Sequence, residues 1–521
     1  MSRIAEWWKK DNRYLTMLKA VLMAALPVVC VLVYCGTQGR HLSEVYLPGS
    51  EWNDELFYYK QVEGIVHFGF PQGYFGFNES HALKLSFAAW SPVLVFPWII
   101  WGLLFGWNLM SPIICNIVFL SLTMFFFVWL TKPAWKQLGV LTLLFSFFTL
   151  FIRFMLSAMP EIICFGMLIL FYGVAVNYLE RERGWKLGIL FGMASVMTLM
   201  RPYLLLCLLL PMFLWIRSSK WKGVAGSLGI FALTLTAYAL IKHYLGAEYF
   251  APLFFTDWFT TFFTDGIGAG VHHFFGTLYY MGTDFFRHIR LGVLTGLASG
   301  AYFFVFLTAG AILILQGWKD LRRGKKNSAV IELHLGLCYV AMLFAILLMY
   351  KLTEGSKHLL TFVAAGIFIV SLMETKTYKK AVLLAALFAY FFSYKASGNF
   401  YDFGVPFAEN DRMAQVNEWQ ALYDGMMELS EDVPPNFENV VIWVLHDTVE
   451  GKNVYMKWQV LYGLPRGFGI SCCMPEYVAE NMDTLQSRYI ATVSGGSIDK
   501  LCEDAGYRLW YRDGDVALYE R

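Results

Sequence analysis

Long apolar runs, separated by short polar segments, fill the chain up to residue 396. A helix of about 20 apolar residues crosses the hydrocarbon core of a bilayer. The run 187–216 is interrupted by Arg201-Pro202 and is interpreted as two short helices, because proline ends or kinks a helix. About eleven transmembrane helices are therefore predicted, over 14–35, 109–131, 138–156, 162–179, two within 187–216, 223–243, 291–317, 329–350, 359–373 and 381–396.

One further apolar run, 87–107, is expected to lie in the membrane interface without crossing. It contains two prolines and four tryptophans, and tryptophan is enriched at the level of the headgroups. The positive-inside rule gives the same answer, because all six basic clusters that flank the runs fall on the cytoplasmic side only if 87–107 does not cross. The N-terminus is then cytoplasmic, and the first loop, 36–108, lies outside with interfacial helices.

Composition agrees with this pattern. Of the 521 residues, 57% are hydrophobic and 15% are charged, and the formal net charge is only +2. Such a composition is typical of a multi-pass protein of the cell membrane and does not indicate a nucleic-acid partner.

The segment 397–521 has a different character and is predicted to be a small extracytoplasmic α/β domain that follows a transmembrane domain of residues 1–396. It is richer in charge, and alternating or β-branched runs predict strands. Helices are expected over 411–429 and 498–505, strands over 440–445, 488–493, 507–512 and 516–520, and a hairpin turn over 512–515. No phosphate-binding loop or nucleophile elbow is present, so this domain is expected to recognise the acceptor or to support the fold.

The first outer loop concentrates acidic and aromatic residues. Within its stretch 47–90 the carboxylates and histidines are Glu51, Asp54, Glu55, Glu63, Glu79, His67 and His81. Carboxylates beside a bilayer are costly, which favours a functional site. The alternative is a solvated loop whose aromatic residues lie at the headgroups.

Cationic groups are predicted near the outer ends of the membrane helices. Arg153 precedes the turn at Pro160-Glu161, and Arg201 stands at the break in 187–216. Arginine in a membrane segment normally faces protein, water or an anion. The alternatives are an ion pair of Arg153 with Glu161 and a snorkelling Arg201.

Two other outer segments have open interpretations. The turn 351–358 ends in Lys357-His358, which could meet a lipid phosphate or make ordinary headgroup contacts. The loop 244–290, rich in glycine and phenylalanine, is expected to be a movable lid or a plain interfacial loop. Metal binding by its adjacent His272 and His273 is not expected, because neighbouring side chains diverge in regular structure.

These residue types suit one reaction in particular. A polyprenyl-phosphate sugar is an activated donor with an anionic, membrane-anchored leaving group, so no ATP site is needed. A carboxylate would act as general base on the acceptor hydroxyl while nearby cations neutralise the departing phosphate.

The chain resembles the GT-C class of membrane glycosyltransferases, in particular the protein O-mannosyltransferase and aminoarabinose transferase branch. The features that carry the resemblance are the acidic pair Asp54-Glu55 after the first span, the interfacial helices, the Pro160-Glu161 turn, the Arg201-Pro202 break and the stretch EGSKHLL. The resemblance covers residues 1–396 and implies an inverting hexosyl- or pentosyltransferase with Asp54, or its neighbour Glu55, as the catalytic residue. The HPPL-like stretch of the family is replaced here by WSPVLVFP, so the donor sugar and the acceptor are not implied.

The predicted substrate-binding residues are Tyr58, Glu79, His81, Arg153, Glu161, Arg201, Lys357 and His358. Tyr58 is included because it shares a helix face with Asp54. The expected partners are the lipid-linked donor, membrane lipid and a glycan, lipid or protein acceptor. No metal-ligand spacing of cysteines and histidines occurs, and a divalent metal beside the acidic pair remains open. Two other functions stay open, a flippase or transporter of lipid-linked glycans and a non-catalytic membrane scaffold.

Overall fold

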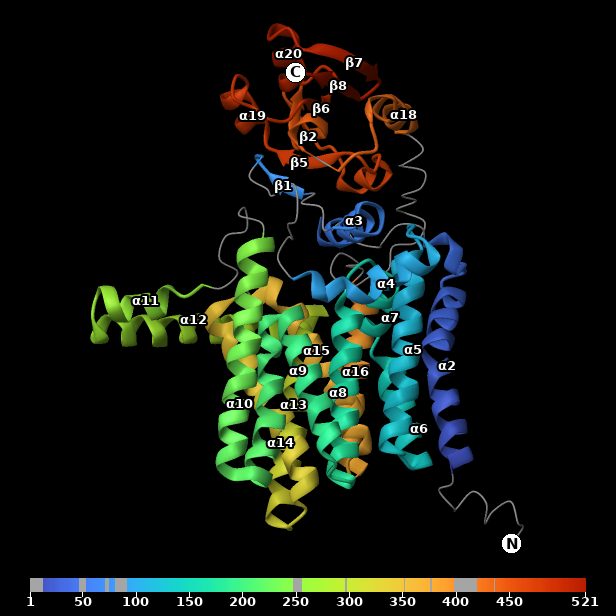
Figure 1. Ribbon diagram of the computed structural model, residues 1–521, viewed down its shortest axis with the longest axis vertical. Helices are drawn as coiled ribbons and strands as arrows, with labels where there is room; N and C mark the ends of the chain where they lie inside the picture. The colour runs from blue at the N-terminus through green and yellow to red at the C-terminus, as the bar shows by residue number, and fades with distance from the viewer. Residues whose placement is uncertain are drawn as a thin grey trace.

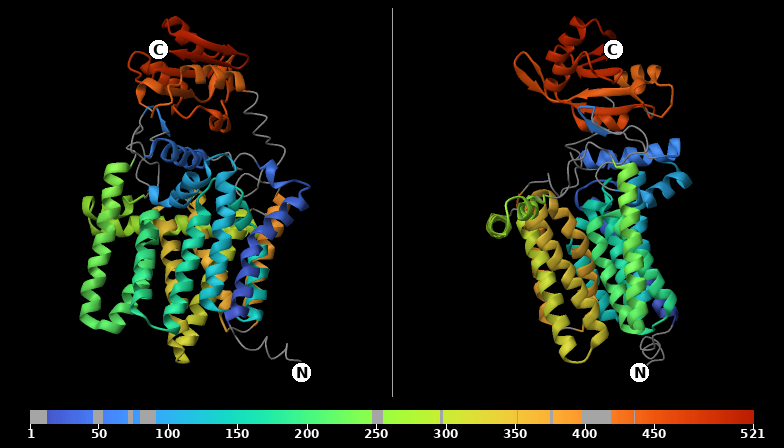
Figure 2. Two further views of the ribbon diagram at one scale, coloured as in Figure 1. Left: turned by 45° about the vertical axis from the view of Figure 1, so that its right-hand side comes forward. Right: turned by 60° about the vertical axis from the view of Figure 1, so that its left-hand side comes forward.

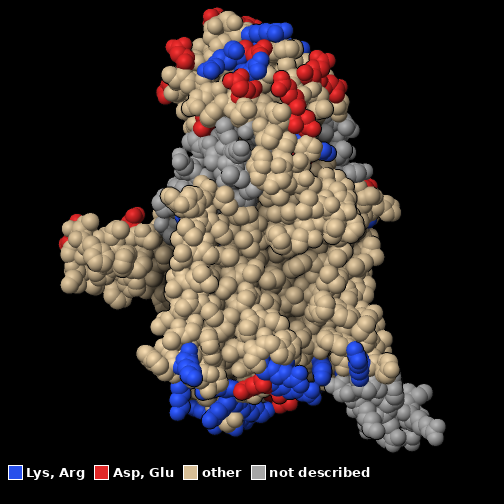
Figure 3. Space-filling view, in the orientation of Figure 1, with Lys and Arg blue, Asp and Glu red and all other residues tan. Residues whose placement is uncertain are grey.

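The computed structural model describes residues 13–45, 53–70, 75–79, 91–246, 255–295, 298–350, 352–374, 377–397, 419–434 and 436–521. The chain forms a bundle of long helices with a small α/β domain over one end (Figure 1). We call this the domain end of the bundle and the opposite end the basic end, because lysine and arginine gather there (Figure 3). The predicted fold class, a mostly helical polytopic protein with a small C-terminal sheet domain, is confirmed.

The bundle helices fall on every predicted span. They are α2 (Arg13–Thr37), α5 (Ser111–Thr131), α6 (Trp135–Phe147), α7 (Leu150–Met155), α8 (Glu161–Glu180), α9 (Gly184–Met200), η3 (Pro202–Leu208), α10 (Leu209–Leu245), α13 (Ala298–Arg322), α14 (Lys326–Met349), α15 (Leu352–Leu372) and α16 (Thr377–Ser397). Among the described residues, six helical stretches are long and apolar enough to cross a membrane: Arg13–Thr37, Ser111–Thr131, Glu161–Glu180, Pro202–Leu245, Phe303–Arg322 and Lys326–Met349.

The stretch Pro202–Leu245 contains two antiparallel arms. The backbone of Lys220 leaves the helical region, with φ 45° and ψ −119°. Beyond it the chain packs back on the first arm so closely that a Cβ atom on Gly223 would stand 2.6 Å from the carbonyl oxygen of Trp215. Glycine allows this contact because it has no side chain.

Four helical elements of the first loop lie at the domain end. They are η1 (Leu42–Glu44), α3 (Asn53–Phe68) and the pair η2 (Pro92–Val95) and α4 (Phe96–Phe105). Helices α3 and α4 lie across the end of the bundle, not along it (Figures 1 and 2).

The expectation of a loop over 244–290 is wrong for its described part, which is helical. Helices α11 (Asp257–Thr264) and α12 (Ile267–Thr295) extend sideways from the bundle (Figures 1 and 2). Gly266, at φ 90°, makes the turn between them, whereas the later glycines lie within α12. Apolar residues at helical spacing outweigh the low helix propensity of these glycines.

The C-terminal domain is built on a six-stranded sheet in the order β1-β5-β2-β6-β8-β7. The strands are β1 (Phe75–Phe77), β2 (Val440–Val444), β5 (Gly469–Cys473), β6 (Tyr489–Val493), β7 (Arg508–Asp513) and β8 (Val516–Glu520), and β3 (Asp447–Val449) pairs with β4 (Lys452–Val454). The helical elements are α18 (Gln420–Leu429), η5 (Phe437–Asn439), η6 (Trp458–Gly463), α19 (Pro475–Asn481) and α20 (Ser497–Asp504). The first four strands in the order are parallel, and β8 and β7 are antiparallel to their neighbours.

The edge strand β1 comes from the first loop and not from the C-terminal segment. It pairs in parallel with β5, with Phe75 opposite Ile470. Sequence patterning identified β2, β6, β7 and β8 but missed both β1 and β5, because a three-residue strand and the run GISCC carry no clear alternation. The sheet therefore ties the first loop to the C-terminal domain.

Candidate functional site

The acidic pair Asp54-Glu55 lies in the first turn of α3, over the domain end of the bundle. Carboxylates in a first helical turn are favoured by the helix dipole. The two side chains have different surroundings, because successive residues of a helix point about 100° apart. Asp54 is half-buried, whereas Glu55 is completely buried.

Glu55 points into the bundle and pairs with Arg153 of α7. Arg153 Nη1 lies 3.4 Å from Glu55 Oε1, and both side chains are buried. The alternative that Arg153 pairs with Glu161 is wrong. Glu55, from a helix that is distant in sequence, reaches Arg153 instead.

Glu161, the first residue of α8, pairs with Arg201. Arg201 Nη2 donates to Glu161 Oε1 at 2.6 Å, and both side chains are fully buried. The alternative of a snorkelling Arg201 is therefore wrong. The extended backbone at the end of α9 turns this arginine into the protein, where Glu161 compensates its charge.

Arg201 also contacts two further segments. Its Nη1 donates to the Tyr203 hydroxyl at 3.2 Å and to His358 Nδ1 of α15 at 3.1 Å. The other carboxylate oxygen of Glu161 is buried and has no hydrogen-bond partner among the described residues. A buried ion pair with an unsatisfied oxygen stabilises a fold poorly, which favours a functional role for this cluster.

Tyr58 joins the acidic pair to the arginine cluster. It lies one turn after Asp54 and is 4% exposed. Burial raises the pKa of the Tyr58 phenol well above its usual range, the Asp54 carboxylate adds to this effect, and Arg201 opposes it. Asp54, Tyr58, Arg201 and Glu161 thus share one electrostatic environment at the domain end.

Sequence reasoning missed the residues that hold the Arg153 turn in place. Asn116 of α5 donates through Nδ2 to the carbonyl groups of Phe154 and Ser157, at 3.1 and 3.0 Å. Trp98 of α4 donates in turn to Asn116 Oδ1 at 2.9 Å. The sequence signal for Asn116 was a polar residue within an apolar run. Tyr203, which contacts Arg201, was also missed, and its signal was its position next to the Arg201-Pro202 break.

Glu79 lies away from this cluster and binds the C-terminal domain. Its carboxylate accepts hydrogen bonds from the backbone N–H groups of Gln486 and Ser487, at 3.1 and 2.6 Å. Its own N–H donates to the Ser471 hydroxyl at 2.9 Å. In this arrangement the side chain fastens the first loop to the sheet.

Two predicted residues are described only in part. His81 lies outside the described residues, and Lys357 lies in α15 beside His358 with its side chain outside the described part. Among the described residues, no three histidine, cysteine or carboxylate side chains are grouped so that they could hold a metal ion.

The carboxyl end of the sheet, where an α/β domain often binds anions, is filled by the chain itself. Asp447 accepts from the N–H groups of Ser497 and Ile498 at the start of α20, at 3.1 and 3.2 Å. A carboxylate already occupies the position that a phosphate takes at a helix N-terminus.

No protein-family model and no curated protein sequence matches the chain. Solved structures similar to the chain include the following two. ArnT from Cupriavidus metallidurans, bound to undecaprenyl phosphate, has a TM-score of 0.52 at 11% identity, with 96% of this chain and 97% of that chain covered. The oligosaccharyltransferase of Archaeoglobus fulgidus in the apo form has a TM-score of 0.49 at 13% identity, with 92% of this chain and 70% of that chain covered. The likeness to ArnT shows that the two chains share a fold, in agreement with the fold that the predicted resemblance implies.

Proposed function

We propose that this protein is a membrane glycosyltransferase that moves a sugar from a polyprenyl-phosphate donor to an acceptor hydroxyl at the domain end of the bundle. The observation that carries the proposal is the meeting of Asp54 with the Arg201 cluster around Tyr58, at one end of a GT-C fold. The neighbour ArnT was solved with undecaprenyl phosphate, which supports the donor class.

Asp54 is the proposed general base. Glu55 is fully buried and held by Arg153, so it is poorly placed to meet an acceptor from outside. Asp54 is only half-buried in the same helical turn and can take the proton of an incoming hydroxyl. Glu55 is then a positioning residue that fixes the start of α3 on the bundle.

The donor phosphate is proposed to lie at the start of α15. Arg201 and Glu161 form a formally neutral pair, so a net positive charge has to come from elsewhere. Helix α15 begins at Leu352, and Lys357 lies in its second turn. The positive end of a helix dipole and a lysine together favour a phosphate. Arg201 donates to His358, the residue after Lys357, and therefore lies close to this position.

Direct displacement follows from this placement. The acceptor hydroxyl loses its proton to Asp54 and forms a bond to the anomeric carbon, while the bond from that carbon to the phosphate oxygen breaks. The electron pair of the broken bond goes to the phosphate oxygen, and polyprenyl phosphate leaves, its negative charge stabilised by the cations. Attack opposite the leaving group inverts the anomeric configuration. The transferred sugar is a hexose or a pentose, and the acceptor is a glycan, lipid or protein of the cell envelope.

The test is sugar transfer by the purified full-length protein in lipid nanodiscs, with a labelled polyprenyl-phosphate sugar. We expect incorporation of label into an acceptor hydroxyl, which a flippase or a scaffold would not produce. Asp54→Asn keeps the shape of the side chain and removes the base, so transfer should fall by about 10²–10⁴ while donor binding persists.

Glu55→Gln and Glu44→Gln are the companion variants. Glu44 lies in the same loop, where its carboxylate pairs with Arg40 and accepts from the backbone N–H of His41, so its loss should leave transfer unchanged. Near-normal transfer by Asp54→Asn would exclude it as the base. Absence of transfer with every donor sugar would contradict the proposed function.

A further inference from the structure

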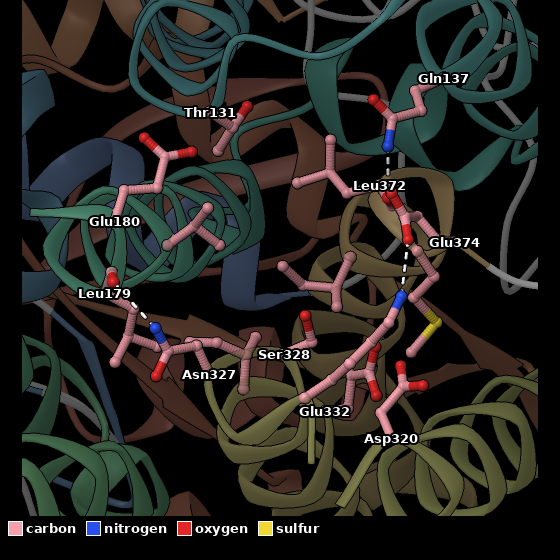
Figure 4. Close-up of a pocket in the computed structure, with 15 residues that line it drawn as sticks. Thr131, Gln137, Leu179, Glu180, Asp320, Asn327, Ser328, Glu332, Leu372 and Glu374 are labelled. Carbon is pink, nitrogen blue, oxygen red and sulfur yellow. Dashed lines mark hydrogen bonds and ion pairs between the residues drawn. The ribbon is translucent and has the colours of Figure 1, made fainter. Parts of the chain in front are cut away.

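A second polar cavity lies at the opposite, basic end of the bundle. It has a volume of about 330 Å³ and opens between the ends of α8, α13, α14 and α15 (Figure 4). Its charged lining consists of the four carboxylates Glu180, Asp320, Glu332 and Glu374 and the single ammonium group of Lys325. The cavity is therefore acidic although the surface around it is rich in lysine and arginine (Figure 3).

One of these carboxylates is buried with an oxygen that no described residue contacts by a hydrogen bond. Glu332 of α14 is 3% exposed, and its Oε2 has no hydrogen-bond partner among the described residues. Of the other carboxylates, Glu374 pairs with Lys325 at 2.7 Å, Asp320 accepts from Gln316 at 3.0 Å, and Glu180 is exposed to solvent.

Glu332 also lies beside a like charge. The Asp320 carboxyl group is directed toward the same side of the cavity (Figure 4) and acts on Glu332 electrostatically, opposed by Lys325 and Lys379. An unpaired carboxylate that is removed from water is costly, and a second one beside it increases the cost. A cationic ligand between the Glu332 and Asp320 carboxylates would compensate their charges and remove this cost.

The chemistry of the cavity favours an organic cation over a metal ion. No group of three metal-ligating side chains occurs among the described residues. An ammonium group offers three N–H donors to carboxylate oxygens. Val176 and Leu179 of α8, Ile331 of α14, and Ile369 and Leu372 of α15 supply aliphatic side chains that suit a short hydrocarbon body. The uncharged polar residues Thr131, Gln137, Asn327 and Ser328 also line the cavity.

We propose that this cavity binds a primary ammonium group on a short aliphatic body, with the ammonium between Glu332 and Asp320. Two sources carry that chemistry, a free aliphatic diamine and the ethanolamine headgroup of a lipid. The site lies at the other end of the bundle from Asp54 and is independent of the proposed transfer reaction.

The experiment uses the full-length protein in nanodiscs of phosphatidylglycerol, which contain no amine lipid. Calorimetric titration with 1,4-diaminobutane should show saturable binding of one molecule per protein, and tetramethylammonium at equal ionic strength should not. Glu332→Gln keeps the side-chain shape and should weaken diamine binding by about tenfold or more. Glu182→Gln removes one charge from a solvent-exposed pair outside the cavity and should not change it.

A second arm identifies the source. If the lipid is the ligand, nanodiscs with phosphatidylethanolamine should weaken the apparent diamine affinity, and native mass spectrometry should retain one such lipid that Glu332→Gln loses. If a free amine is the ligand, the lipid should have no effect. Should Glu332→Gln fail to fold, Asp320→Asn gives the same test. Equal diamine binding in wild type and variant, or no binding of either amine, would overturn the proposal.

Discussion

Two buried arginines at the domain end have different roles in the candidate site. Arg153 is paired with Glu55 of the first loop, and Arg201 is paired with Glu161 inside the bundle. Breaking either pair would leave a buried charge uncompensated, at a cost of about 3–5 kcal/mol. The Arg153–Glu55 pair positions α3. The Arg201–Glu161 pair holds Arg201 in place beside the proposed phosphate position.

The donor position predicts that loss of either nearby cation weakens donor binding. Lys357→Gln and Arg201→Gln should each weaken binding of the polyprenyl-phosphate donor by about tenfold or more, because each removes a positive charge from the leaving group's surroundings. The measurement is donor titration into nanodisc-embedded protein.

Lys242→Gln is the control for this series, since Lys242 is an exposed cation in the last turn of α10. Its donor affinity should equal that of wild type. Unchanged donor affinity in both Lys357→Gln and Arg201→Gln would contradict the phosphate position.

At the scale of elements, close helix contacts and the shared sheet hold the site together. The arms of α10 approach at Gly223, and the first loop contributes β1 to the C-terminal sheet. The C-terminal domain also holds helix α3, because Lys60 Nζ donates to the Leu464 carbonyl at 3.1 Å. The proposed base therefore stands on a helix that is held by both parts of the molecule.

Gly223→Ala should destabilise the protein by about 1–3 kcal/mol, because the new Cβ atom would stand 2.6 Å from a backbone oxygen that cannot move freely. Gly229→Ala, in the same arm, meets nothing within 4 Å and should be neutral or slightly stabilising. Thermal unfolding of the two variants in one detergent measures the difference. Equal melting temperatures would show that the arms are not packed as described.

Glu79→Gln should loosen the junction between the first loop and the sheet. The amide keeps one acceptor oxygen but loses the charge that strengthens the bonds to Gln486 and Ser487, a loss of about 1.5–3 kcal/mol. Hydrogen exchange at these two amides should become faster. Glu476→Gln, an exposed change in the same domain, should leave their exchange unchanged.

At the scale of the whole molecule, the charge distribution predicts the orientation. Lysine and arginine gather at the end of the bundle opposite the C-terminal domain (Figure 3). The positive-inside rule therefore predicts that the basic end is cytoplasmic and that the C-terminal domain is extracytoplasmic.

Cysteines introduced at Trp135 and Lys500 test this orientation in intact cells. Both positions are exposed, and all nine native cysteines are buried, so background labelling should be low. A membrane-impermeant thiol reagent should label position 500 from outside and position 135 only after permeabilisation. The reverse pattern would invert the topology and place the candidate site in the cytoplasm.

The sequence by itself determined the helical spans, the break at Arg201-Pro202 and four strands of the C-terminal domain. Hydrophobic patterning is a local property, because each segment that crosses a bilayer or packs in a sheet needs its own apolar residues. The same patterning identified the acidic and basic residues of the candidate site as unusual in their surroundings.

Only the tertiary structure decided how those residues pair. Glu55 with Arg153, Glu161 with Arg201, and Glu79 with the C-terminal sheet join positions that are 98, 40 and 408 residues apart. Such partners depend on which helix ends meet, and no local pattern encodes that choice. The helical form of 267–295 and the β1 strand were missed for a related reason, since propensity and alternation are weak in both and packing against the rest of the molecule selects their conformation.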